Sequence, residues 1–159
     1  MNADAPSAVL DLAALEAWGR RIGAEAFPGL VVGLTGPLGA GKTTLVRAIV
    51  DGAGGDPASV ASPTFVLVQE HQGRFPITHI DVYRLKTVQE FLDLGVEELF
   101  PTSLCLIEWA ERVRDHLPVD RLEISLSLVD EPTRKVQWEA FGKTKDMTTL
   151  LEALDFDAV

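Results

Sequence analysis

The chain has 159 residues, of which 47% are hydrophobic, and its 14 Lys and Arg against 24 Asp and Glu give a net charge of −10. This size and apolar content predict a single domain with a hydrophobic core. Nucleic-acid affinity comes mainly from basic side chains that neutralise phosphates, so the acidic balance excludes an extended nucleic-acid site of the usual kind. A small basic patch, or binding to nucleic acid through a partner, stays open.

The remaining composition indicates a cytoplasmic protein without membrane contact. The first residues lack the basic region and apolar stretch of a signal peptide, and no apolar run approaches the length of a membrane span. Cys105, the single cysteine, lies inside the apolar run 104–107. A buried core thiol is therefore favoured over a redox role.

The first third of the chain predicts a helix, a buried strand and a second helix. Apolar residues at helical spacing predict a helix over about 11–26, with Asp11 as its N-cap. The apolar run 30–35 is typical of a buried parallel strand, and residues 45–53 again show helical spacing before Gly52, Gly54 and Gly55 end the helix.

Between that strand and helix lies Gly36-Pro37-Leu38-Gly39-Ala40-Gly41-Lys42-Thr43, which fits the phosphate-binding loop pattern at every constrained position. Such a loop turns backbone N–H groups toward a phosphate at the positive end of a helix. We expect Lys42 to reach the β- and γ-phosphates and the Thr43 hydroxyl to bind Mg²⁺. The alternative is a glycine-rich turn that binds nothing. The residues predicted to contact ATP phosphates are Gly36, Gly39, Ala40, Gly41, Lys42, Thr43 and Thr44.

The middle of the chain predicts two neighbouring strands and a short helix. Residues 65–70 and 77–82 read as strands separated by a turn. Thr87 and Glu90 have the spacing of a capping box in front of a short helix that Gly95 ends.

The last third predicts a strand over 103–108 that ends in Glu108, and a helix over 110–117 that Pro118 ends. Alternating apolar and polar residues over 122–128 and 136–140 predict an antiparallel hairpin, and residues 149–159 a short helix with an acidic tail. The sum is an α/β fold, a single domain like that of the P-loop NTPases. Its parallel core sheet has antiparallel edge strands and flanking helices, and the ligand lies at the carboxyl ends of the parallel strands.

Two acidic residues end predicted strands and could complete a nucleotide site. Glu108 is placed to hold Mg²⁺ together with Thr43, unless it is simply a solvated carboxylate. Asp81 could orient or deprotonate the attacking water or support the metal indirectly, or it could be a surface residue paired with Arg84. His79 lies two residues before Asp81, so its side chain could point to the same side of the strand. A purely structural role for this histidine is nevertheless favoured.

The base is predicted to be adenine. Guanine-specific proteins carry an Asn/Thr-Lys-x-Asp segment, and in Thr144-Lys145-Asp146 the acid comes one residue too early. ATP is therefore favoured over GTP.

Several segments together, in this order and in so short a chain, resemble the TsaE (YjeE) family. They cover residues 10–142 and leave residues 143–159 without a role. The segments are 36–44, Ser62-Pro63-Thr64-Phe65, His79-Ile80-Asp81-Val82-Tyr83-Arg84, Leu94-Gly95 with Glu97, and Ile107-Glu108-Trp109-Ala110-Glu111.

This resemblance implies a small Mg²⁺-dependent ATPase that acts with TsaD and TsaB in forming threonylcarbamoyladenosine at position 37 of tRNA, with tRNA contacted mainly by the partners. It implies that Lys42, Thr43 and Glu108 bind Mg-ATP, that Asp81 assists hydrolysis, and that segment 62–65 and Trp109 are switches, although Trp109 could be a core aromatic. Leu12 and Arg134 lie where the base could pack. The competing hypotheses are a small-molecule kinase and a nucleotide-dependent binding switch with negligible turnover.

Overall fold

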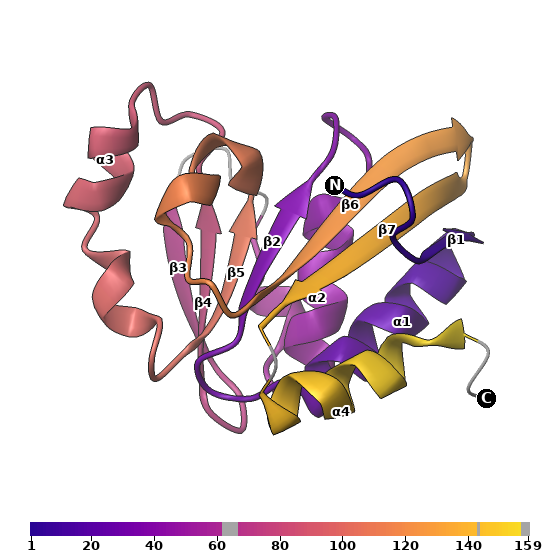
Figure 1. The fold of residues 1–159 in the computed structure, drawn as a ribbon, viewed down its shortest axis with the longest axis horizontal. Helices are drawn as coiled ribbons and strands as arrows, with labels where there is room; N and C mark the ends of the chain where they lie inside the picture. The colour runs from indigo at the N-terminus through magenta and orange to yellow at the C-terminus, as the bar shows by residue number, and fades with distance from the viewer. Residues whose placement is uncertain (62–66, 143, 157–159) are drawn as a thin grey trace.

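The computed structural model describes residues 1–61, 67–142 and 144–156. A seven-stranded sheet in the order β1-β7-β6-β2-β5-β4-β3 forms its centre (Figure 1). Strands β6, β2, β5 and β4 run parallel, whereas β1, β7 and β3 pair antiparallel with their neighbours. The predicted fold class is thus confirmed. The strands are β1 (Ser7–Leu10), β2 (Val31–Thr35), β3 (Val68–Gln72), β4 (Pro76–Asp81), β5 (Leu104–Glu108), β6 (Arg121–Asp130) and β7 (Thr133–Phe141).

Helices cover both faces of the sheet. On one face α1, α2 and α4 enclose the larger apolar cluster, and on the other α3 packs with short 3-10 helices over the smaller one. None of the helices that the structure describes is both long and apolar enough to cross a membrane. The helices are α1 (Leu12–Glu25), α2 (Lys42–Gly52), α3 (Val88–Asp93) and α4 (Lys145–Leu154), with the 3-10 helices η1 (Pro57–Ser59), η2 (Val96–Leu99), η3 (Ala110–Arg112) and η4 (Arg114–His116).

Capping contacts confirm the predicted starts of two helices, α1 and α3. The Asp11 carboxylate accepts a hydrogen bond from the Ala14 backbone N–H at 2.8 Å, which satisfies one of the free donors at the start of α1. The Thr87 hydroxyl caps α3 in the same way by accepting from the Glu90 N–H. The Glu90 carboxylate, however, accepts from the N–H of Lys86, so only half of the predicted capping box forms.

Three predicted elements differ from the structure. The helix expected over 110–117 is instead two 3-10 helices, and Val113 between them departs from helical geometry, with φ −128° and ψ 16°. The strand expected over 65–70 is described from Val68 and continues to Gln72, where it still pairs with Pro76. The last helix begins at Lys145, four residues before the predicted start.

The C-terminal segment, to which the sequence assigned no role, belongs to the main core. Met147, Leu150 and Leu154 of α4 are buried among the residues of α1 and the sheet. The Trp18 indole N–H donates to the Leu154 carbonyl at 3.3 Å, and the Phe156 ring stacks on that of Trp18. Residues 144–156 are therefore part of the folded domain.

Burial also settles the state of the cysteine. Cys105 lies on β5 within the smaller apolar cluster and is fully buried. Burial raises the pKa of its thiol to about 11, and hydrogen bonds from Ser103 and Thr78 only partly oppose this. The predicted core thiol is confirmed, because a thiol held in its neutral form is a poor nucleophile.

Candidate nucleotide-binding site

The phosphate loop joins the end of β2 to the start of α2. Gly36 has a φ of +143°, and a Cβ there would lie 2.4 Å from the Leu126 carbonyl oxygen, so a side chain cannot be accommodated. Gly41, with a φ of +107°, directly precedes α2. The first-turn N–H groups of a helix have no acceptor inside the helix, and together with the helix dipole they favour an anion. The loop therefore presents an anion-binding backbone.

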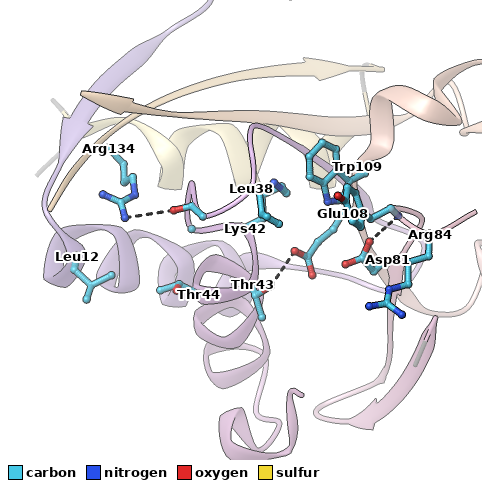
Figure 2. Close-up of a pocket in the computed structure, with 13 residues that line it drawn as sticks. Leu12, Leu38, Lys42, Thr43, Thr44, Asp81, Arg84, Glu108, Trp109 and Arg134 are labelled. Carbon is cyan, nitrogen blue, oxygen red and sulfur yellow. Dashed lines mark hydrogen bonds between the residues drawn. The ribbon is translucent and has the colours of Figure 1, made fainter. Parts of the chain in front are cut away.

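A pocket of about 490 Å³ lies beside this loop (Figure 2). It brings together residues from α1, the loop, α2, the ends of β4 and β5, and β7. Of the residues predicted to contact phosphate, Gly36 and Ala40 do not line it; Ala40 is buried. The lining residues are Leu12, Leu38, Gly39, Gly41, Lys42, Thr43, Thr44, Asp81, Tyr83, Arg84, Glu108, Trp109 and Arg134.

Lys42 is held between the loop and an aromatic ring. Its ammonium donates to the carbonyl oxygens of Gly36 and Pro37, the latter at 2.9 Å, and lies 4.1 Å from the centre of the Trp109 ring. Burial lowers the pKa of Lys42, whereas nearby carboxylates, Glu108 foremost, oppose that shift. The side chain is thus a partly desolvated cation at the wall of the pocket.

Trp109, which the resemblance implies to be a switch, lines the pocket. Among the described residues other than glycine, Trp109 alone has a left-handed backbone (φ +63°), and it directly follows β5. Its ring lies 4.8 Å from that of Tyr83, and the Arg112 guanidinium lies over both rings. The Trp109 side chain therefore contacts the loop lysine on one side and the segment after β4 on the other.

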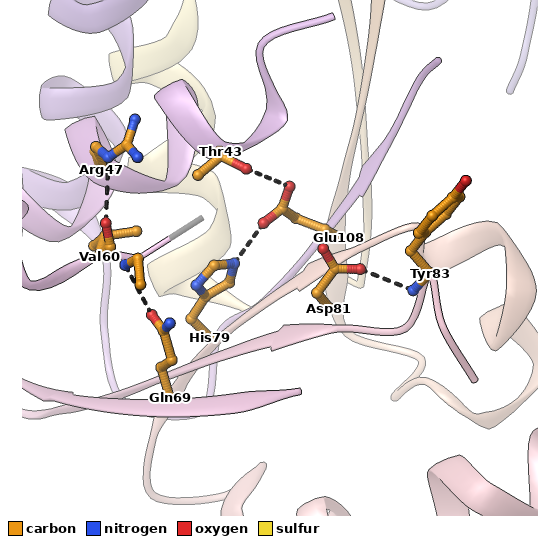
Figure 3. Close-up of polar contacts among 9 residues, drawn as sticks. Thr43, Arg47, Val60, Gln69, His79, Asp81, Tyr83 and Glu108 are labelled. Carbon is orange, nitrogen blue, oxygen red and sulfur yellow. Dashed lines mark hydrogen bonds and ion pairs between the residues drawn. The ribbon is translucent and has the colours of Figure 1, made fainter. Parts of the chain in front are cut away.

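The two predicted carboxylates meet because β4 and β5 are parallel neighbours in the register that pairs Asp81 with Glu108. The Thr43 hydroxyl donates to Glu108 Oε1 at 3.0 Å, which joins the first turn of α2 to the end of β5 (Figure 3). The other oxygen of Glu108, Oε2, lies 2.5 Å from Nε2 of His79.

Asp81 is 6% exposed and lines the pocket beside Glu108. One of its oxygens accepts a hydrogen bond from the Tyr83 N–H at 2.8 Å. Burial raises the pKa of Asp81 and the neighbouring Glu108 charge adds to this, although the Tyr83 hydrogen bond opposes it. A carboxylate that takes a proton more readily than usual suits proton transfer.

The two predicted base contacts lie on the opposite side of the loop from the carboxylates (Figure 2). Leu12 is 47% exposed at the start of α1 and lines the pocket. The Arg134 guanidinium donates to the Ala40 carbonyl at 2.9 Å, so this side chain also braces the loop from β7.

Some pocket residues were not predicted as site residues. Tyr83 and Arg84 come two and three residues after Asp81, and the motif that contains all three was the signal that could have identified them. Leu38 lies in the loop at a position the phosphate-loop pattern leaves unconstrained, so no signal pointed to it. Ser62, Pro63, Thr64 and Phe65, predicted as a switch, lie outside the described residues.

The side-chain oxygen atoms at the pocket suit a hard cation such as Mg²⁺. The Thr43 hydroxyl and the Glu108 carboxylate offer two oxygen atoms 3.0 Å apart, which are of the type that Mg²⁺ prefers. Among the described residues, no three His, Cys, Asp or Glu side chains gather as a metal site, so the remaining ligands would be water and phosphate oxygens. Mg²⁺ is commonly held in this way beside a nucleotide.

Comparisons with known proteins identify the family of this chain. The family model of the threonylcarbamoyl adenosine biosynthesis protein TsaE matches residues 9–136. The chain is 39% identical to the tRNA threonylcarbamoyladenosine biosynthesis protein TsaE of Treponema pallidum over 75% of the chain and 88% of that protein. It is also 39% identical to that of Bacillus subtilis, over 78% of each. The crystal structure of Bacillus subtilis YdiB superimposes with a TM-score of 0.73 at 28% identity, covering 96% of this chain and 97% of YdiB. The chain therefore belongs to the TsaE family, which takes part in threonylcarbamoyladenosine formation in tRNA.

Proposed function

We propose that this protein hydrolyses Mg-ATP as an accessory subunit in the modification of tRNA adenosine 37 to N6-threonylcarbamoyladenosine, in the cytoplasm and together with TsaD and TsaB. The threonylcarbamoyl transfer itself belongs to another subunit. Family membership supports the pathway, and the phosphate-loop pocket supports the reaction. The net charge of −10 supports a division of labour in which the partners supply most of the tRNA contact.

One observation carries the proposal: the Thr43 hydroxyl and the Glu108 carboxylate meet at 3.0 Å beside Lys42, at the start of α2. These two side chains would hold Mg²⁺, which supplies charge neutralisation on the phosphates. Lys42 would leave the loop carbonyls to bind the β- and γ-phosphates. Asp81 would orient or deprotonate the attacking water, or support the metal through a hydrogen bond.

The base would pack near Leu12 and Arg134, which line the far end of the same pocket. Neither side chain offers a carboxylate that could read the guanine edge, and the chain lacks the segment that guanine-specific proteins use. Adenine is accordingly the proposed base.

A small-molecule kinase is less well supported. Such enzymes commonly close an arginine-rich lid over the phosphates. Here Arg114 and Arg121 bind Glu123 at 3.1 and 3.0 Å, and neither lines the pocket. Arg112 binds the Tyr83 carbonyl and is also absent from the lining.

Turnover by the purified chain tests the proposal. Free phosphate and phosphorylated products are measured for the chain alone and after addition of TsaD and TsaB. We expect phosphate release that the partners stimulate. A phosphorylated small molecule made without partners would establish the kinase instead, and nucleotide binding without any turnover would establish a binding switch.

Two substitutions test the roles of individual residues. Lys42→Ala removes a charged hydrogen bond worth about 1.5–3 kcal/mol, so ATP affinity should fall roughly 10- to 150-fold. Glu108→Ala should abolish Mg²⁺-dependent turnover. The matched controls are Lys145→Ala and Glu152→Ala, which alter exposed residues of α4 outside the pocket. If Lys42→Ala hydrolyses ATP like its control, the loop assignment is wrong.

A further inference from the structure

The buried pair of His79 and Glu108 has a consequence for the metal site. His79 lies on β4, two residues before Asp81, and is only 2% exposed. Its Nε2 lies 2.5 Å from Glu108 Oε2, whereas Glu108 Oε1 accepts the Thr43 hydroxyl at 3.0 Å. Figure 3 shows the carboxylate between these two side chains. Both oxygens of Glu108 are thus engaged, by different elements of the fold.

We propose that His79 is a positioning residue, which sets the orientation of the Glu108 carboxylate for Mg²⁺. The proposal rests on the proposed function, because it assigns Glu108 to the metal. A carboxylate only accepts hydrogen bonds, so Nε2 carries the hydrogen and donates it to Oε2. Nδ1 is then an acceptor on the far side of the ring. His79 does not line the pocket, so it acts through Glu108 and does not touch the nucleotide.

The other ring nitrogen argues against a purely structural role. Nδ1 of His79 is buried and has no hydrogen-bond partner among the described residues. A buried polar atom without a partner destabilises the fold, so an apolar side chain would fill this space better. The contact that compensates for this cost is the one that Nε2 makes with Glu108.

The orientation of Glu108 matters because competing donors lie close by. The Glu108 carboxylate is 2% exposed and interacts electrostatically with the Lys42 ammonium. Without the His79 donor, Oε2 would lose its partner in a buried site, and the carboxylate could turn toward Lys42. Mg²⁺ requires nearly ideal octahedral geometry, so it tolerates such a rotation poorly. Loss of a group that supports a metal ligand typically weakens metal binding about 10- to 100-fold.

Binding of a non-hydrolysable ATP analogue, AMPPNP, tests the proposal without turnover. Its affinity is measured by calorimetry in EDTA and over a Mg²⁺ titration. His79→Phe removes the donor and keeps a flat ring, whereas His79→Gln keeps an N–H donor of similar reach. We expect His79→Phe to need about 10- to 100-fold more Mg²⁺ for its half-maximal effect, with affinity in EDTA unchanged within two-fold. His79→Gln should restore a Mg²⁺ response within a few-fold of the parent.

A double substitution separates positioning from packing. In the Glu108→Ala background the histidine has no carboxylate to orient, so adding His79→Phe should leave the Mg²⁺ response unchanged. Melting temperatures are measured first, and if His79→Phe does not fold, His79→Asn takes its place, because its shorter amide does not reach Oε2.

Three results would overturn the proposal. The first is that His79→Phe keeps the Mg²⁺ response of the parent protein, whereas Glu108→Ala loses it. That result would leave the proposed function intact. The second is a loss of affinity in EDTA as large as the loss in Mg²⁺, which indicates packing alone. The third is a parent protein whose AMPPNP binding ignores both Mg²⁺ and Lys42→Ala, which removes the proposed function and this inference together.

Discussion

Truncation of one buried leucine in α4 measures how far the C-terminal segment supports the nucleotide-binding domain. Leu150 is 0% exposed and belongs to the core cluster that α1, α2 and the sheet share. Leu150→Ala removes its apolar burial and leaves a cavity, at a cost of about 2–5 kcal/mol. Domains of this size have a total stability of about 5–15 kcal/mol, so the variant should still fold at room temperature.

The same cost converts to a melting temperature. For a domain of about 150 residues each kcal/mol lowers the melting temperature by about 2–4 °C, so a loss of about 3 kcal/mol predicts a decrease of roughly 6–12 °C. Thermal denaturation followed by circular dichroism measures it. Glu152→Ala, two residues along α4 at an exposed position, is the control and should stay within about 1 °C of the parent. Because Leu150 does not line the pocket, ATP affinity well below the transition should not change.

A decrease of less than about 2 °C for Leu150→Ala would refute this reasoning, because a fully packed leucine cannot be removed so cheaply. It would mean that α4 does not dock on α1 in solution. An equal decrease for Glu152→Ala would mean that the loss at Leu150 does not come from its burial, because alanine is a better helix former than glutamate.

Two further predictions concern the pocket. Burial raises the pKa of Asp81 in the folded protein above its ordinary value of 3.8. Ionisation of Asp81 therefore costs folding free energy, and stability falls as the pH rises from about 3.8 through the raised pKa. Asp81→Asn removes this loss, and its melting temperature relative to the parent should be higher at pH 7 than at pH 4; equal differences at both pH values would contradict the cause. For Trp109→Phe we expect most of the ATP-induced change in tryptophan fluorescence to disappear, since Trp109 lines the pocket and contacts Lys42, whereas Trp18 and Trp138 are buried elsewhere. A signal change of parental size in this variant would show that another tryptophan reports binding.

Local patterns were sufficient where the chemistry is local. The loop between β2 and α2, the Asp11 cap and the hairpin of β6 and β7 each depend on residues close together in the chain. Apolar residues that recur every 3.6 or every 2 residues identify helices and strands, because side chains return to the same face at that spacing. It was less useful for residues 110–117, where packing of Ala110, Val113 and Leu117 on the smaller cluster accompanies 3-10 turns in place of a continuous helix.

By itself, the sequence of this protein determined the phosphate loop, the strand ends that carry Asp81 and Glu108, and the α/β class. Only the tertiary structure decided which residues face each other: the register that pairs Asp81 with Glu108, and the hydrogen bonds of Glu108 to Thr43 and His79. It also decided that α4 completes the core against α1. The physical reason is that a period of two tells which face of the sheet a side chain occupies, but not which strand lies beside it. That choice depends on burying both faces of the whole sheet at once, and no short segment of the chain contains it.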